Sequence, residues 1–260
     1  MTLIVLFANH AYSEATPIVL YASEYPPFYA SHLAQQGVIS DIVVTAFART
    51  NLSVHVEFLP FRRGLTQIQE GRADGMFALW YSNERAQQLW FSDAIESNEI
   101  VLLRRIDDVR TMDPHNLHGL RIGNVRGYLP PDVILQQNIR LNEVSLDSQL
   151  LMMLAHNRLD AIIIDRWVAN HLITTQMPEL LGQVVAIEPP LERKAMHVVF
   201  SKTRSHSLAL RDQFNDALQQ LRDEGIIADI LRRHGFEHDL VTMAAEKRQN
   251  VHPHQVNALP

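Results

Sequence analysis

Five times along this 260-residue chain, a short apolar run that reads as a β-strand ends in polar or aromatic residues. The runs and the positions that follow them are Ile18–Ala22 with 24–28, Val54–Leu59 with 60–63, Ala73–Leu79 with 80–85, Leu120–Val125 with 126–128, and Leu159–Ile164 with 165–167. In open α/β sheets, ligands bind just beyond the carboxyl ends of the strands. The pattern therefore predicts both an α/β fold and a binding site for a small polar ligand at the strand ends.

Composition and charge exclude several functional classes. Apolar residues make up 47% of the chain and charged residues 20%, which is typical of a globular protein with a real core. The length allows one large domain or two of ordinary size. A net charge of -6 argues against nucleic-acid binding, which usually needs a basic face. The absence of cysteine excludes disulfides, thiol nucleophiles and cysteine-ligated zinc.

The first fifteen residues are typical of an export signal. Leu3–Ala8 is continuously apolar, and Ala15 closes a short stretch of the kind that a signal peptidase accepts. The run is too short to span a bilayer as a helix, which needs about 20 residues. A basic segment at the start is missing, and the alternative is an ordinary N-terminal arm. We expect a signal peptide over 1–15 and a soluble, periplasmic mature chain that starts near Thr16.

Apolar residues recur at helical spacing between the predicted strands, which gives an alternating order of strands and helices. Further strands are predicted at Ile100–Arg104, Asn142–Val144 and His197–Phe200. The predicted helices are Val38–Arg49, Phe61–Glu70, Asn83–Leu89, Asp147–His156, Trp167–Gln176, Ser207–Arg222 and Ile226–His234. This alternation predicts two α/β lobes with mainly parallel sheets. The acidic stretch Asp107–His115 reads as a linker.

The segment after Phe236 loses periodicity, and we expect a loosely ordered tail over 238–260. The chain has 13 histidines, with close pairs at 115/118, 234/238 and 252/254. A zinc site needs three or four converging ligands. These pairs fall in loops, at a helix end and in the tail, so we expect structural or incidental roles and no metal site.

Two charged residues at strand ends are candidates for ligand contacts. Arg85 opens a helix, where a guanidinium can hold a carboxylate through two parallel hydrogen bonds and the helix amides add donors. An arginine at a helix start is more often a surface or ion-pair residue. Asp165 follows a buried run and needs a partner, because unpaired burial of a carboxylate is costly. A ligand ammonium, a helix amide or a nearby arginine would each serve.

Aromatic residues also gather at the strand ends, at Tyr25, Phe28, Phe61, Trp80 and Tyr128. Such rings can stack on a flat or aliphatic ligand group. For any single one of them, ordinary core packing is the more common role, and we assign Phe28 to structure.

Several short motifs together resemble one known family, the amino-acid-type solute-binding proteins of bacterial ABC importers (family 3). The most specific part is Gly-Arg-Ala-Asp-Gly at 71–75, followed by Asn-Glu-Arg at 83–85 and Phe-Ser-Asp at 91–93. Weaker matches are at 25–28, 117–127, 157–161 and 221–225. The set stands in order and at family spacing from Pro17 to Phe236.

The resemblance implies a two-lobed periplasmic-binding-protein fold of type II, in which each lobe is a mainly parallel sheet flanked by helices. The first lobe would comprise 16–102 and 204–237, and the second 103–203. A two-segment hinge would cross near Ile100–Arg105 and Phe200–Arg204, and its closure would trap the ligand. The implied function is capture of an amino acid or an amino-acid-like compound for ABC-type uptake. The expected partner is an ABC permease or a sensor protein, and we expect a monomer without cofactors.

The same resemblance assigns roles to individual residues. Arg85 would clamp the ligand α-carboxylate and Asp165 would pair with the α-amino group. Tyr25 and Phe61 would line the side-chain pocket of the first lobe. The second lobe would contribute Arg126, Gly127 and Tyr128 at the carboxylate end, and Trp80 completes the predicted set of ligand-binding residues.

The sequence departs from the importer pattern at two places, which leaves alternatives open. Bulky residues stand at Trp80 and Tyr81, and Tyr128 and Leu129 follow Gly127 where importer relatives carry hydroxyl residues. The run at 60–64 is more typical of an offshoot often found without an importer. One alternative is a sensory or partner-docking module. Another is an enzyme similar to cyclohexadienyl dehydratase, but no nucleophile motif is present and we expect no enzyme.

Overall fold

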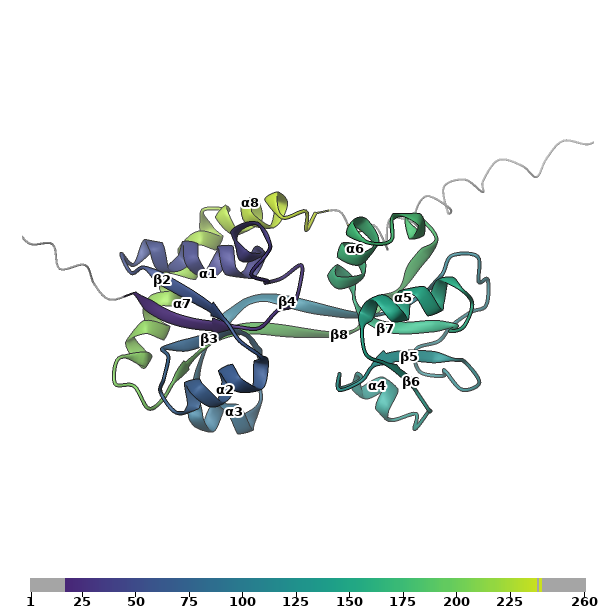
Figure 1. Cartoon of the computed structure of the whole chain (residues 1–260), viewed down its shortest axis with the longest axis horizontal. Helices are drawn as coiled ribbons and strands as arrows, with labels where there is room; N and C mark the ends of the chain where they lie inside the picture. The colour runs from purple at the N-terminus through teal and green to yellow at the C-terminus, as the bar shows by residue number, and fades with distance from the viewer. Residues whose placement is uncertain (1–16, 238, 240–260) are drawn as a thin grey trace, which may run out of the picture.

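The computed structural model describes residues 17–237 and residue 239 (Figure 1). The expected signal peptide lies outside these residues, and so does the expected tail apart from Asp239. None of the helices in the described part of the chain is long and apolar enough to cross a membrane.

Eight strands form one mixed sheet in the order β2-β1-β3-β8-β4-β7-β5-β6. Their bounds are β1 Ile18–Ala22, β2 Val54–Phe58, β3 Gly75–Trp80, β4 Leu89–Arg105, β5 Ile122–Val125, β6 Asn142–Val144, β7 Ala161–Asp165 and β8 Val184–Ser201. Strand β1 pairs in parallel with β2 and β3, and β5 pairs in parallel with β6 and β7. The α/β class with parallel flanks is therefore confirmed, but the flanks join through an antiparallel centre into one sheet.

Helices cover both faces of the sheet at each end (Figure 1). Their bounds are α1 Val38–Arg49, α2 Phe61–Gln69, α3 Asn83–Gln88, α4 Asp132–Leu135, α5 Asp147–Ala155, α6 Arg166–Thr175, α7 Ser207–Asp223 and α8 Ile226–Arg233, with short 3-10 turns at Ala34–Gln36 and Pro178–Leu180. We call β1–β3 with α1–α3, α7 and α8 the first lobe. We call β5–β7 with α4–α6 the second lobe. The lobes stand apart in Figure 1, and β4 and β8 run through both.

Strands β4 and β8 are much longer than the sequence predicted. They pair antiparallel from Leu89 opposite Ser201 to Arg105 opposite Val184, with register shifts along the way. Their middle sections are polar, for example at 96–99 and 192–194. Polar residues there break the apolar pattern by which a strand is recognised, so only the ends Ile100–Arg104 and His197–Phe200 were predicted.

The interpretation of Asp107–His115 as a linker is corrected by the structure. The lobes are connected by the two long strands, whereas this segment packs within the second lobe, where Met112 is buried with Ile122. Asp108 is also buried, and its Oδ1 accepts from Arg110 Nε at 2.9 Å. The Arg110 hydrogen bonds lower the pKa of Asp108 to about 2.

Two motif aspartates hold equivalent positions in the two lobes. Asp74, in the Gly-Arg-Ala-Asp-Gly motif, accepts from Val19 N at 2.8 Å and forms ion pairs with Arg204 and His206. Asp160, in the second lobe, accepts from Arg121 N at 2.8 Å and forms an ion pair with Arg110 at 2.7 Å. Each carboxylate ties the start of one strand to the loop before a neighbouring strand. Both therefore have structural roles.

Replacement of Asp160 by asparagine should lower the free energy of unfolding at pH 7 by about 1–3 kcal/mol, because the charged acceptor for Arg110 and Arg121 is lost. These arginines hold the pKa of Asp160 well below its usual range. The carboxylate therefore stabilises the fold above the unfolded-state pKa, and this contribution is lost as the pH falls below about 4.

Urea denaturation of the Asp160→Asn variant at pH 7 and at pH 3 measures both effects. Asp216→Asn, at an exposed position of α7, is the control and should change stability little. Equal losses from the two substitutions at pH 7 would contradict the role given to Asp160.

Candidate functional site

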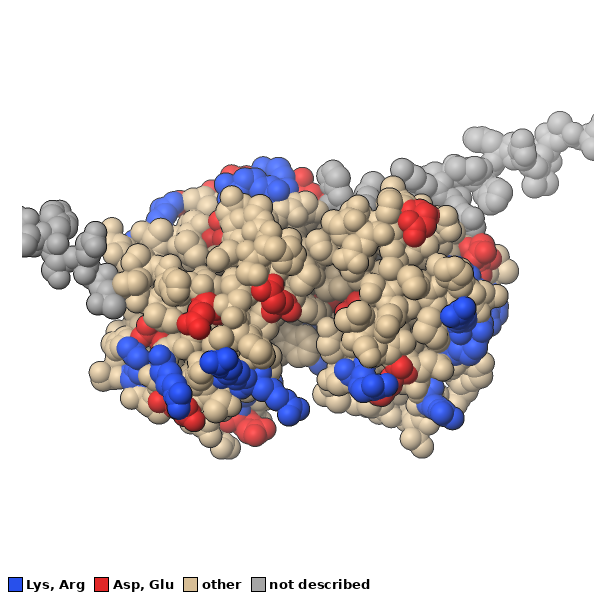
Figure 2. All heavy atoms as spheres, in the orientation of Figure 1, with Lys and Arg blue, Asp and Glu red and all other residues tan. Residues whose placement is uncertain are grey.

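A cavity of about 1230 Å³ lies between the lobes. The surface is visibly hollowed between them in the space-filling view (Figure 2). The first lobe lines the cavity with the end of β1, the start of α2, the end of β3 and α3. The second lobe contributes the residues after β5 and the end of β7, and the middle of β4 and β8 forms the floor. Strand ends that are distant in the sequence thus converge on one site.

Seven of the eight predicted ligand-binding residues line this cavity. They are Tyr25, Phe61, Trp80, Arg85, Gly127, Tyr128 and Asp165. The structure does not bring Arg126 to them. Arg126 N donates to Val144 O and so extends the pairing of β5 with β6. Its side chain is 68% exposed and lies 3.5 Å from Glu143 of β6.

Arg85 is held in place by groups of the first lobe. Ser82 caps α3 and accepts from Arg85 N at 3.2 Å. Arg85 Nη1 donates to Trp80 O at 2.8 Å, and the guanidinium lies 5.6 Å from the centroid of the Phe61 ring. A guanidinium has five N–H donors in a fixed fork. Arg85 is therefore oriented by its neighbours and retains donors for a carboxylate.

Asp165 ends β7 and caps α6. Its Oδ1 accepts from Trp167 N at 2.8 Å and from Val168 N at 3.1 Å, so helix amides are among its partners. Its Oδ2 accepts from Asn98 Nδ2 at 3.0 Å. Because the residue is only 3% exposed, burial raises the pKa of Asp165 to about 7 despite these hydrogen bonds. The Glu99 backbone N–H is a further hydrogen-bond donor to this carboxylate, which lines the cavity.

Asn98 connects the two lobes inside the cavity. It is 1% exposed, and its Oδ1 accepts from Trp80 Nε1 at 2.8 Å while its amide donates to Asp165. A hydrogen-bonded chain thus runs from the end of β3 in the first lobe to the end of β7 in the second. The sequence did not predict Asn98, because it lies in the polar middle of β4, where no strand end marks it.

A bulge near the end of β3 precedes Trp80. The pairing with β8 shifts register between Met76 and Leu79, and Ala78 has φ 63, in the left-handed region that non-glycine residues rarely adopt. Bulges of this kind redirect the side chains that follow. The unusual Ala-Leu-Trp-Tyr sequence thus places the Trp80 indole beside Asn98.

The aromatic side chains divide into buried and open ones. Phe28 is fully buried and stacks on Tyr25, with ring centroids 5.6 Å apart, which agrees with its assignment to structure. Tyr128 is 45% exposed, and its hydroxyl lies 3.4 Å from Asp147 Oδ2. Phe61 is also partly exposed. Apolar surface from both lobes therefore borders the cavity.

Lys194 is a second cation in the cavity that the sequence did not predict. It stands opposite Asn98 in the β4–β8 register, so the two side chains share a face of the sheet. Its Nζ lies 4.6 Å from the centroid of the Trp80 ring and 3.1 Å from Glu192 Oε2. Lys194 lies in the middle of β8, away from the strand ends at which the sequence pattern places binding residues.

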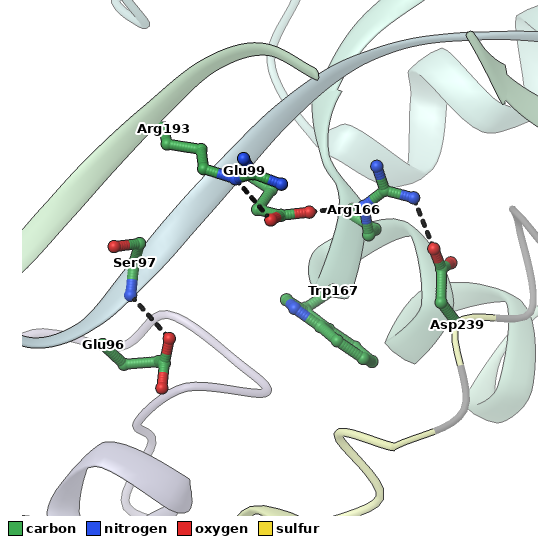
Figure 3. Close-up of a pocket in the computed structure, with 7 residues that line it drawn as sticks. All are labelled: Glu96, Ser97, Glu99, Arg166, Trp167, Arg193 and Asp239. Carbon is green, nitrogen blue, oxygen red and sulfur yellow. Dashed lines mark hydrogen bonds and ion pairs between the residues drawn. The ribbon is translucent and has the colours of Figure 1, made fainter. Parts of the chain in front are cut away.

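Glu99 and Arg193, the strand neighbours of Asn98 and Lys194, line a smaller pocket of about 370 Å³ (Figure 3). Its centre is Arg166, whose side chain is 5% exposed. Arg166 pairs with Glu99 of β4, Glu188 of β8 and Asp239, and Arg193 of β8 also pairs with Glu99. Glu99 and Asp239 are thus engaged with the arginines of this pocket, whereas Glu96 accepts from Ser97 N at 3.1 Å. The cluster fastens α6 and Asp239 to the two long strands.

No group of three or more metal-ligating side chains converges within the described residues. His234, from one of the predicted histidine pairs, has its Nε2 3.0 Å from Asp41 Oδ2 and so joins α8 to α1.

The model of one protein family matches most of the chain. It is described as bacterial extracellular solute-binding proteins, family 3, and it matches residues 18–238. The chain belongs to this family, as its sequence motifs predicted. No curated protein sequence matches the chain.

Solved structures share the fold at low identity. The GluR0 ligand-binding core from Nostoc punctiforme, in complex with L-glutamate, has a TM-score of 0.66 at 18% identity, over 84% of this chain and 99% of that one. A substrate-binding protein of an ABC uptake transporter from Streptococcus pneumoniae, with bound histidine, has a TM-score of 0.65 at 19% identity, over 87% and 94%. A histidine kinase sensor domain similar to periplasmic binding proteins has a TM-score of 0.64 at 16% identity, over 84% and 96%.

Replacement of Asn98 by alanine should lower the free energy of unfolding by about 2–3 kcal/mol, because Trp80 Nε1 and the buried Asp165 Oδ2 each lose a partner. Asn215→Ala is the matched control. Asn215 Oδ1 accepts a single hydrogen bond, from Asp93 N at 2.9 Å, at the surface, whereas Asn98 makes two in the interior. Urea denaturation, followed by tryptophan fluorescence, compares the two variants. An Asn98→Ala loss no larger than that of Asn215→Ala would contradict the connecting role of Asn98.

Proposed function

We propose that this protein captures an amino acid or an amino-acid-like compound in the interlobe cavity and delivers it for ABC-type uptake. The observation that carries the proposal is that an oriented guanidinium from the first lobe and a buried carboxylate from the second line the same cavity. A molecule with a carboxylate and an ammonium group complements both. Family membership and the ligand-bound neighbours support the same reading.

Arg85 receives the ligand carboxylate in this proposal. Its contacts with Trp80 O and the Phe61 ring fix the side chain before the ligand arrives. Less side-chain freedom is then lost on binding, which favours affinity. Arginine is suited to the task because its planar fork matches a carboxylate.

Asp165 receives the ligand ammonium. Burial penalises its charged form in the free protein, as the raised pKa records. A cation brought next to the carboxylate offsets this penalty, so binding lowers the pKa of Asp165 and favours ionisation. Asn98 and the α6 amides keep the carboxylate aimed while the ligand enters.

We further propose that the lobes close over the ligand by bending of β4 and β8. The bend would fall where Asn98 pairs with Lys194 and the register is irregular on either side. Closure would cover Tyr81, which is 58% exposed, and Leu129, which is 67% exposed, on opposite lobes of the cavity. The mature chain would be exported to the periplasm and act as a monomer.

The proposal predicts that the ligand is held at both ends. In a thermal-shift and calorimetric screen of amino acids, opines, small carboxylates and aromatic precursors, at least one compound should stabilise the protein by mass action. Arg85→Ala and Asp165→Ala should each weaken its binding by about 10- to 100-fold, since hydrogen bonds to charged groups contribute about 1.5–3 kcal/mol. Arg126→Ala, outside the cavity, is the matched control and should bind normally. Loss of binding in Arg126→Ala, with normal binding in the other two variants, would contradict the proposed site.

Ligand binding should also depend on pH through Asp165. Because the pKa of Asp165 is about 7 in the free protein, its ionised fraction falls as the pH drops from 8 to 5. Affinity for a ligand with an ammonium group should therefore fall up to tenfold per pH unit below 7. Calorimetry at pH 5, 6, 7 and 8 measures this profile. Asp165→Asn should flatten it, and an unchanged profile would contradict the ammonium contact.

One neighbour favours a second candidate function. The histidine kinase sensor domain has the same fold over most of this chain, so the cavity could report a ligand to a partner. A partner that binds only the ligand-loaded protein and lacks a transport pore would support this alternative. We propose binding without catalysis in either case. Turnover of prephenate or arogenate would instead support the enzyme alternative.

A further inference from the structure

Two cationic side chains of the cavity, Arg85 and Lys194, each contact Trp80. The Trp80 carbonyl oxygen accepts from Arg85 Nη1 at 2.8 Å, and the Trp80 indole carries Lys194 Nζ at 4.6 Å from its centroid. Both cations line the same cavity. Trp80 therefore contacts both a guanidinium, through its backbone carbonyl, and an ammonium group, through its ring, and both groups line the cavity.

Lys194 is held in place and is largely desolvated. Its side chain is 17% exposed, and the aromatic face and Glu192 Oε2 (3.1 Å) restrain it. An ammonium group has three donors, and its contact with Glu192 is an ion pair without a hydrogen bond. A partly desolvated cation in a low-dielectric cavity attracts an anion more strongly than a surface lysine does.

Two of the three other acidic residues that line the cavity accept hydrogen bonds from protein groups. Glu24 is engaged by Ser31, whose hydroxyl donates to Oε1 at 2.6 Å. Asp165 is bound by Asn98 and the α6 amides. Glu84, on α3, completes the acidic lining residues.

One face of several aromatic rings in the cavity is already covered. Lys194 covers Trp80, Arg85 lies over Phe61, and Phe28 stacks on Tyr25. These arrangements leave less ring surface to sandwich a flat ligand group. In two of them, at Trp80 and Phe61, the covering group is a cation.

We propose that Lys194 binds a second anionic group of the ligand, and that the ligand class is the acidic amino acids and related dicarboxylates. This inference rests on the proposed function, in which Arg85 holds the first carboxylate. Lys194 selects the side-chain carboxylate, and Trp80 sets the spacing between the two anion positions.

The chain contains a matched control for Lys194. Lys202 also lies over a tryptophan, with Nζ 4.0 Å from the Trp90 centroid, and donates to Ala86 O at 2.6 Å. It is not among the residues that line the cavity. Lys194→Met and Lys202→Met therefore remove the same chemical group from the same kind of contact, inside and outside the cavity.

The test is calorimetry of the full chain with L-glutamate, L-aspartate and their neutral isosteres, L-glutamine and L-asparagine. The wild type should bind one acidic compound at least tenfold more tightly than its amide. Lys194→Met should reduce that preference to about twofold or less, because it weakens binding of the acidic compound far more than binding of the amide, and Lys202→Met should retain the full preference. Glutarate, which lacks the amino group, tells a dicarboxylate ligand from an amino acid: Lys194-dependent binding that survives Asp165→Asn supports recognition of two anions alone.

Several outcomes would overturn the inference. Equal affinity for acid and amide, equal weakening of both by Lys194→Met, or no binding of any acidic probe would each do so. Failure of the proposed function is distinguishable, because Arg85→Ala would then leave the binding of every compound unchanged. Thermal unfolding of the ligand-free variants verifies that each is folded, and Lys194→Gln provides a second variant if Lys194→Met is not.

Discussion

The antiparallel pairing of β4 with β8 is the constraint on which the rest of the structure depends. These two strands belong to both lobes, and they pair from Leu89 to Arg105. Successive side chains on these strands point to opposite faces, so neighbouring residues line different pockets. Asn98 and Lys194 face the ligand cavity, whereas Glu99 and Arg193 face the arginine-centred pocket. The residues that line the cavity and the Arg166 cluster therefore lie on opposite faces of the two strands that connect the lobes.

Charge burial explains the layout of the site. A buried carboxylate such as Asp165 needs hydrogen-bond donors, and the start of α6 supplies two of them. Asn98 supplies a third donor, and its Oδ1 accepts a hydrogen bond from Trp80 Nε1. Trp80 in turn positions Arg85 and Lys194. Arg85, Lys194 and Asp165 thus belong to one network of contacts that spans both lobes.

The motifs that identify the family divide between the cavity, where Glu84 and Arg85 lie, and the framework of the lobes. Asp74 and Asp160 tie strands together within their lobes, and the Ser92 hydroxyl accepts from Val198 N at 2.9 Å. These three side chains fix the backbone of neighbouring strands relative to one another.

The sequence by itself determined the order of strands and helices and most of the cavity. Residues such as Arg85 and Tyr128 were predictable because parallel strands of one sheet bring their carboxyl ends to the same edge. Only the tertiary structure decided that Arg126 turns toward Glu143 and that Asn98 and Lys194 join the site. The physical reason is that these side chains are placed by partners far away in the chain: Asn98 meets Asp165 67 positions later, across strands whose pairing no local pattern specifies.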